Sequence, residues 1–133
     1  MATVFEMIIN GDIPSTKLYE DELCLVILDI NPINYGHALV ISKKVYPTFT
    51  DCPAETLSHM MEIAKKVDRK QRQALGAEGT NIIINNSPAS GQEVPHLHIH
   101  VIPRFKGDGK TAAIEKGKYD ADALSAMGAK LCL

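Results

Sequence analysis

Helical spacing of apolar residues marks both ends of the chain. Near the start, Ala2–Ile9 carries apolar residues three and four positions apart and is followed by Asn10-Gly11, a pair that commonly ends a helix. Near the other end, Ala121–Leu131 shows a weaker pattern of the same kind. We therefore expect a short helix at each end.

A much longer helix is predicted in the middle of the chain. Between Pro53 and Leu75 the basic residues mostly avoid one apolar stripe. The stripe consists of Leu57, Met60, Met61, Ala64, Val67, Ala74 and Leu75. Asp51 or Cys52 is expected to begin this helix, and Gly76 can end it in a left-handed conformation. His59 lies off the stripe, which predicts a solvated surface histidine.

Five shorter runs have the composition of β-strands. They are Lys17–Glu20, Leu23–Asp29, Ala38–Ser42, Thr80–Ile84 and Val94–Arg104. Asp21-Glu22 suggests a hairpin between the first two runs, Asn31–Gly36 is rich in turn formers, and the glycines of Lys106–Lys110 predict a mobile turn. Strands and helices do not alternate regularly, so an antiparallel sheet is favoured over a parallel one. The predicted fold is α+β, an antiparallel sheet of about five strands with one long helix and short terminal helices.

Length and composition are those of one ordinary domain. The 133 residues are 45% apolar and 23% charged, and we expect a single domain over residues 1–133. The longest apolar run, Leu23–Leu28, is far shorter than the ~20 residues that cross a bilayer, so no membrane partner is expected. The first residues also lack the pattern of a secretion signal, which makes a cytoplasmic location the expectation.

Charge and cysteine content narrow the possible partners. A formal net charge of −2 argues against a general electrostatic grip on nucleic acid, so any bound nucleotide should be small. Cys24, Cys52 and Cys132 are odd in number and widely spaced, which fits free thiols without a catalytic role.

The strongest chemical signal is a histidine at every second position within Val94–Arg104. Because side chains alternate across a strand, His96, His98 and His100 should share one face while apolar residues fill the other. Buried imidazoles without partners are costly, so a purely structural origin is disfavoured. Two chemical interpretations compete: three ligands of a zinc ion with an open fourth position, or nucleophilic catalysis on phosphorus.

The residues upstream favour phosphorus chemistry. Asn85–Gln92 offers amide and hydroxyl donors, and Gly91 lets backbone N–H groups approach an anion. Donors placed where negative charge grows are what phosphoryl transfer requires. His98, with like groups on both sides, is then the natural attacking residue, and His96 or His100 would polarise the phosphate.

The stretch Gly91–Ile102 resembles the signature of the histidine triad family, His-φ-His-φ-His-φ-φ with φ apolar, preceded by Gly-Gln. The resemblance extends over about residues 3–105 and leaves 106–133 unassigned. Its other matching segments, in the expected order, are Phe5–Pro14, Leu23–Pro32, Gly36–Ile41 and Asn81–Asn86. It implies a histidine triad type of α+β domain that forms a homodimer and binds a purine nucleotide.

The family resemblance implies catalytic roles for four histidines. His98 would attack the α-phosphate and form a nucleotidyl-histidine intermediate that water then hydrolyses, without a metal or another cofactor. His100 would contact the phosphate or its leaving group, and His96 would orient the other rings. His37 would join the cluster from a neighbouring strand.

The same resemblance implies a nucleotide-binding set. Asp29 would accept hydrogen bonds from the ribose hydroxyls. The apolar slot around the base would be formed by Phe5, Ile8, Ile27 and Ile30, and the phosphate would be held by Asn85, Gly91 and Gln92. Without the resemblance, the four apolar residues would be read as core, and Asp29 would be read equally well as a turn residue or as a site residue.

The chain also departs from the family pattern. Members that hold structural zinc often carry Cys-x-x-Cys near the start, where this chain has Thr3–Glu6. A histidine is also often found soon after the Val-Ile-x-Lys segment, and here that position is Val45. We therefore expect no metal. Glu93 stands where many members have Ser or Thr; its carboxylate should point away from a phosphoanion or shift the leaving-group preference towards amines.

Together these patterns predict a nucleotide hydrolase or transferase acting at the α-phosphate of purine nucleoside phosphoramidates or dinucleotides, with phosphoramidates slightly favoured. Two alternatives stay open. One is a nucleotide-binding regulatory module with little turnover. The other is a metallohydrolase that uses His37, His96, His98 and His100.

Overall fold

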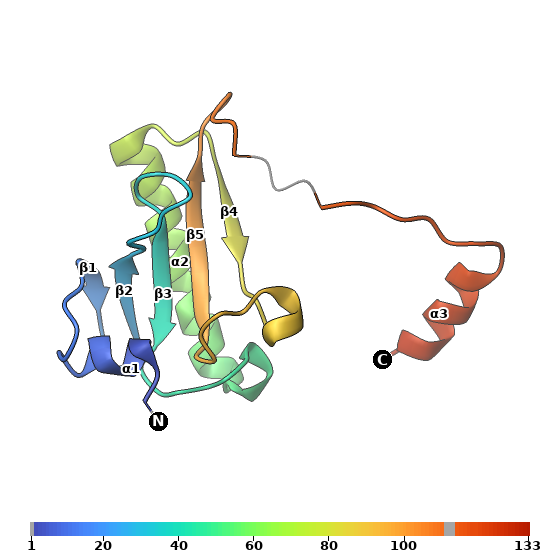
Figure 1. Ribbon diagram of the computed structural model, residues 1–133, viewed down its shortest axis with the longest axis horizontal. Helices are drawn as coiled ribbons and strands as arrows, with labels where there is room; N and C mark the ends of the chain where they lie inside the picture. The colour runs from blue at the N-terminus through green and yellow to red at the C-terminus, as the bar shows by residue number, and fades with distance from the viewer. Residues whose placement is uncertain (1, 111–113) are drawn as a thin grey trace.

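A five-stranded antiparallel sheet forms the centre of the computed structural model, which describes residues 2–110 and 114–133 (Figure 1). The strands are β1 (Lys17–Glu20), β2 (Cys24–Leu28), β3 (Ala38–Ser42), β4 (Gly79–Ile83) and β5 (His98–Arg104). They lie in the order β1-β2-β3-β5-β4, and each neighbouring pair runs antiparallel. The predicted fold class is confirmed.

The long helix covers one face of the sheet. The helices are α1 (Val4–Ile9), α2 (Ala54–Leu75) and α3 (Ala123–Leu131), with short 3₁₀ segments at Phe49–Asp51 and Pro88–Ser90. α2 packs on β3 and β5 and is followed by Gly76 with a φ of 70°, the left-handed cap that was predicted. The main core lies between α2 and the sheet, because alternate strand residues point to this helix. It consists of Cys24, Val26, Ala38, Val40, Cys52, Met60, Ile63, Ala64, Leu97, Ile99 and Val101.

α1 lies on the opposite face of the sheet. A second apolar cluster forms there from Phe5, Ile8, Leu25, Ile27, Leu39 and Ile41. In the register of β3 and β5, Ile41 pairs with His98 and Leu39 pairs with His100, so both imidazoles belong to this face. The predicted separation of an apolar face from an imidazole face is therefore confirmed for β5.

The buried side of α2 differs from the predicted stripe. Met61 and Leu75 are 39% and 47% exposed, whereas Ile63 and Gln71 are buried. The buried face differs from the predicted one because α2 packs over both β3 and β5. Gln71 belongs to this buried face because its amide nitrogen donates to two backbone carbonyls. The helix also begins later than expected, at Ala54.

His59 lies at the surface as predicted, but it is paired with an acidic side chain and is only partly exposed. Its Nε2 lies 2.6 Å from Oδ2 of Asp21 in the β1–β2 turn, and only 34% of its side chain is exposed. The pairing depends on a residue 38 positions away, which the helical spacing could not reveal.

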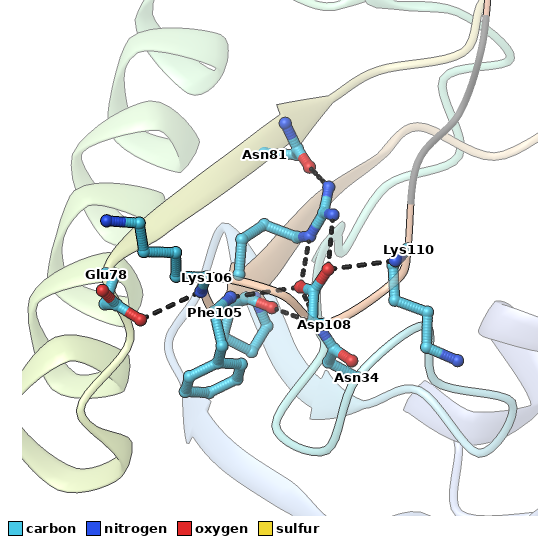
Figure 2. A network of polar contacts seen from close by, with 9 residues as sticks. Asn34, Glu78, Asn81, Phe105, Lys106, Asp108 and Lys110 are labelled. Atoms are coloured by element: carbon cyan, nitrogen blue, oxygen red, sulfur yellow. Dashed lines mark hydrogen bonds and ion pairs between the residues drawn. The ribbon is translucent and has the colours of Figure 1, made fainter.

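The turn after β5 is fastened rather than mobile. Figure 2 shows Asp108 at the centre of a polar network, where it accepts from Arg104 Nε and Nη2 at 2.8 Å and from Asn34 Nδ2 at 2.9 Å. It also accepts from the backbone N–H groups of Phe105 and Lys110. The network holds the loop that contains Asn34 against the end of β5, and these contacts lower the pKa of Asp108 strongly.

The C-terminal helix stands apart from the sheet (Figure 1), and its residues are not buried. Cys24 and Cys52 are buried, Cys132 is exposed, and all three are free, as the spacing predicted. Within residues 2–110 and 114–133, no helix is long and apolar enough to span a membrane.

Candidate active site

A cavity of about 430 Å³ opens on the face of the sheet that carries α1. Three imidazoles, those of His37, His98 and His100, form part of its wall. Other lining residues include Phe5, Ile8, Ile27, Asp29, Ile30, Leu39, Asn85, Gly91, Glu93 and Val94. Most of the residues selected from the sequence are thus brought together from α1, β2, β5, the loop between β2 and β3 that ends at His37, and the loop before β5.

His98 presents a free ring nitrogen at this cavity. Its Nδ1 lies 2.7 Å from the carbonyl oxygen of His96. A carbonyl oxygen can only accept, so Nδ1 carries the proton of the neutral ring and Nε2 keeps its lone pair. Among the described residues, Nε2 has no hydrogen-bond partner, and the Phe5 ring packs edge-on with its centroid 4.8 Å away.

His96 is fully buried behind His98 and does not line the cavity. Its Nε2 donates to the carbonyl of Ser42 at 2.6 Å, and its Nδ1 lies 2.8 Å from the hydroxyl of Thr3. His96 precedes β5 rather than belonging to that strand as predicted. With both nitrogens engaged, it can support its neighbour but offers no atom to a ligand.

His37 and His100 form a second pair. The backbone N–H of Ile33 donates to His37 Nδ1 at 3.1 Å, so the proton of the neutral ring is on Nε2. That Nε2 lies 3.0 Å from His100 Nδ1 and 3.6 Å from Asp29 Oδ2. Donation to His100 leaves the His100 proton on its own Nε2. His100 therefore offers an N–H donor, whereas His98 offers a lone pair.

Burial keeps these imidazoles uncharged. It lowers the pKa of His37, His96 and His98. It also lowers the pKa of His100 to about 4, with further contributions from repulsion by His98 and His37. Asp29 acts in the opposite direction on three of the rings, but burial has the larger effect. At neutral pH the cluster therefore holds neutral rings, with a lone pair on His98 Nε2 and an N–H donor on His100 Nε2.

The residues predicted around the base and ribose surround the cavity unevenly. Phe5, Ile8 and Ile27 are between 4% and 8% exposed, so they serve as core and cavity wall at once. Ile30 is 88% exposed and lies at the rim. Asp29 directly follows β2, and its Oδ1 accepts from the N–H of Asn31 at 2.9 Å. Its second oxygen lies 3.6 Å from His37 Nε2, and the residue lines the cavity.

Of the three residues in the loop before β5 that were predicted to hold a phosphate, only two line the cavity. Asn85 and Gly91 line the cavity, and Gly91 has a φ of 101° that favours glycine. Gln92 does not line the cavity: its amide oxygen accepts from the N–H of Ser87, and its nitrogen donates to the carbonyl of Pro47. Gln92 braces this loop instead of facing a phosphate. Glu93 lines the cavity, so its side chain does not avoid the site.

Several contributors were missed from the sequence, and three of them bear directly on the histidines or the cavity wall. Leu39 lines the cavity, and its alternation with Ile41 along a strand could have identified it. Thr3 contacts His96, and the Thr-x-x-Glu pattern before an apolar run is a recognisable capping box. Ser42 acts through its backbone carbonyl, for which the sequence carries no signal.

The four-histidine metal site considered from the sequence is not assembled. Both ring nitrogens of His96 and of His37 take part in hydrogen bonds. Asp29, His37 and His100 do place one ligand atom each within 4.8 Å of the others. A metal ion bound there would have to break the bond between His37 and His100.

Comparisons with known proteins found relatives over most of the chain. The family model of the HIT domain matches residues 10–107. An adenylylsulfatase of Arabidopsis thaliana is 42% identical over 105 residues, which cover 79% of this chain and 53% of that protein. An adenosine 5′-monophosphoramidase of Schizosaccharomyces pombe is 38% identical over 104 residues, with 78% and 75% covered.

A solved structure extends the likeness to almost the whole chain. The structure of a HIT family member from Bacillus subtilis superposes with a TM-score of 0.87 at 33% identity, covering 98% of this chain and 94% of the other. The likeness in fold therefore covers the sheet and the helices described above. The chain belongs to the HIT domain family, which is the histidine triad family that its sequence resembles.

Proposed function

We propose that this protein is a nucleotide hydrolase that cleaves at the α-phosphate of a purine nucleoside phosphoramidate or dinucleotide. The observation that carries the proposal is His98, whose Nε2 keeps a lone pair at the cavity because Nδ1 is held by the His96 carbonyl. Two relatives support it, because their names, adenylylsulfatase and adenosine 5′-monophosphoramidase, point to adenosine nucleotides.

The proposed reaction has two steps. The His98 Nε2 lone pair attacks phosphorus, forming an N–P bond while the bond to the leaving group breaks with its electron pair. The leaving group is protonated by water, and the positive charge on the His98 ring is stabilised by Nδ1–H donation to the His96 carbonyl. Water then attacks phosphorus, and the N–P bond breaks with its electron pair returning to Nε2. The attacking water gives its proton to the hydroxide left by the first step, and nucleoside monophosphate is released from a neutral ring. His100 Nε2–H donates to a phosphate oxygen in both steps.

We expect the cavity to bind a purine nucleotide in one orientation. The apolar part around Phe5, Ile8 and Ile27 would hold the base, and Asp29 would accept from the ribose hydroxyls. Asn85 and Gly91 would lie along the phosphate. Glu93 lines the same cavity and adds a carboxylate near His98, so we expect an amine leaving group to be preferred over an anionic one.

A homodimer through β4 is also proposed. β4 is an edge strand without charged residues, and its Ile82 and Ile83 are 42% and 38% exposed. The other edge, β1, carries an ion pair between Lys17 and Glu20 at 3.1 Å, a feature that discourages strand pairing. Pairing of two copies through β4 would continue the sheet and cover the isoleucines.

His98→Asn tests the proposed function directly. We expect its kcat for an adenosine phosphoramidate to fall on the order of 1,000-fold or more, while AMP binding by calorimetry stays within about two-fold. His59→Asn is the matched control, since His59 pairs with Asp21 away from the cavity, and it should keep wild-type turnover. Mass spectrometry of wild-type protein quenched during turnover should find a nucleoside monophosphate adduct on His98.

Other outcomes distinguish the rival functions. AMP binding without turnover in the wild type would favour a regulatory binding module. Activity that disappears on prolonged chelation and returns with a divalent metal would favour a metallohydrolase. Either result would overturn the hydrolase proposed here.

A further inference from the structure

A chain of hydrogen bonds connects the first turn of α1 to the triad. Thr3 is the N-cap of α1: its hydroxyl accepts from the N–H of Glu6 at 3.1 Å, and its own N–H donates to Glu6 Oε1 at 2.9 Å. The same hydroxyl lies 2.8 Å from Nδ1 of His96, 93 positions away in the sequence. One oxygen atom therefore closes the helix cap and touches the triad.

The partners decide where each proton lies. The Ser42 carbonyl can only accept, so His96 Nε2 is protonated and His96 Nδ1 must accept from the Thr3 hydroxyl. The His96 carbonyl in turn receives the Nδ1–H of His98. Because His96 is 0% exposed, bulk water does not reach the ring to replace the hydroxyl. Removal of the hydroxyl would leave a buried acceptor without a donor.

We propose that Thr3 is a positioning residue for His98: its hydroxyl donates to His96 Nδ1 while the Ser42 carbonyl holds Nε2–H, and the ring fixed between them places the His96 backbone carbonyl that keeps the proton of His98 on Nδ1. The kinetic consequence rests on the proposed function, whereas the arrangement of protons does not. Phe5 acts from the same helical turn, with its ring centroid 5.6 Å from that of His96 and 4.8 Å from that of His98. The short helix therefore packs both rings edge-on and supplies the donor that orders them.

Glu6 provides a matched control because it contributes only to the cap. Glu6→Ala removes the acceptor of the Thr3 N–H but leaves the Thr3 hydroxyl beside His96. Thr3→Val removes the hydroxyl and nearly preserves the shape of the side chain. Thr3→Ser restores the hydroxyl. Thr3→Asp keeps a good capping acceptor but cannot donate to His96, so it reverses the direction of that hydrogen bond.

The first measurement reads the tautomers directly, by long-range ¹H–¹⁵N NMR of the histidine rings. We expect wild type, Glu6→Ala and Thr3→Ser to show His96 protonated only at Nε2 and His98 only at Nδ1. Thr3→Val should leave His96 protonated at Nε2, because the Ser42 carbonyl remains, but should show mixed tautomers at His98, because the His96 carbonyl is no longer held in place. Thr3→Asp should protonate His96 at Nδ1. If Thr3→Val does not fold, Thr3→Asp decides the matter, because its helix cap is retained. Wild-type tautomers in a folded Thr3→Val or Thr3→Asp protein would overturn the proposal.

The second measurement is turnover of an adenosine phosphoramidate. We expect kcat of Thr3→Val to be about ten-fold lower with KM within about two-fold, as befits the loss of one buried donor, and Thr3→Ser to recover most of it. Glu6→Ala should stay within about two-fold of wild type. An equal loss of kcat in Glu6→Ala and Thr3→Val would reduce Thr3 to a structural cap and refute the positioning role. If the tautomers shift as expected but the wild type has no activity, the proposed function fails and the positioning by Thr3 stands.

Discussion

The histidines of the site are chemically alike, but their hydrogen-bond partners give them different roles. A carbonyl makes His98 a lone-pair donor towards the cavity, and His37 makes His100 an N–H donor beside it. His96 is removed from the cavity altogether by its bonds to Thr3 and Ser42. Because desolvation lowers the pKa of all four rings, they differ from one another in tautomer rather than in charge.

The lowered pKa of His100 makes folding stability depend on pH. The folded chain keeps this ring neutral down to a pKa of about 4, whereas the unfolded chain binds a proton near the ordinary value of 6.5. The stability that the folded chain gains from a neutral His100 ring is therefore fully present above pH 6.5 and is lost as the pH falls to about 4. We expect the free energy of unfolding, from urea titrations at constant ionic strength, to decline across this window.

His100→Gln should make that decline shallower, since one ring that must stay neutral in the folded state is removed. An identical decline in the variant and the wild type would show that His100 does not titrate as its burial requires.

The loop between β2 and β3, which ends at His37, is anchored by hydrogen bonds from α2 and to the residues after β5. Gly36 directly precedes His37, with a φ of 97°, and its carbonyl accepts from Gln71 of α2 at 3.0 Å. Asn34 in the same loop donates to Asp108 beyond β5. Ile33, also in this loop, supplies the N–H that sets the tautomer of His37. The long helix and the end of β5 therefore both help to place a cavity residue that neither contains.

Gly36→Ala tests this element. A Cβ at position 36 would come within 2.5 Å of Leu75 Cδ1, and alanine is strained at positive φ, so we expect a loss of about 1–3 kcal/mol in the free energy of unfolding. Gly76→Ala is the control, because Gly76 has a similar φ but open space around it, and it should lose only about 1 kcal/mol. Equal losses in urea denaturation would show that Leu75 moves aside without cost.

At the scale of the whole molecule, the two edges of the sheet differ in charge and in exposed apolar surface. The uncharged edge is β4, and the strand beside it is β5, which carries His98 and His100. A second copy paired through β4 would therefore lie only one strand away from the imidazoles. Such pairing would also stiffen the strand on which the proposed chemistry depends.

Ile82→Lys is expected to convert the proposed dimer to a monomer in sedimentation equilibrium, because a buried lysine on an edge strand opposes pairing. Leu18→Lys, which adds the same charge to the opposite edge where Leu18 is 51% exposed, should leave the dimer intact. A wild-type protein that sediments as a monomer, or a dimer that survives Ile82→Lys, would contradict pairing through β4.

Local and periodic features were determined by the sequence alone. Alternation of histidine with apolar residues in β5 assigned its two faces, because side chains along a strand must alternate whatever surrounds them. Turn formers and helical spacing separated the five strands from α1 and α2. The spacing of the signature was sufficient to indicate the family.

Tertiary structure alone decided which atoms are free to react. The ring protons of His96, His98 and His100 are set by a threonine, two carbonyls and a histidine that lie between 2 and 93 positions away. Tertiary structure likewise decided that Gln92 hydrogen-bonds within its own loop and that His59 pairs with Asp21. Hydrogen bonds depend on where backbone and side-chain atoms point after folding, and residue spacing along the chain does not contain those directions.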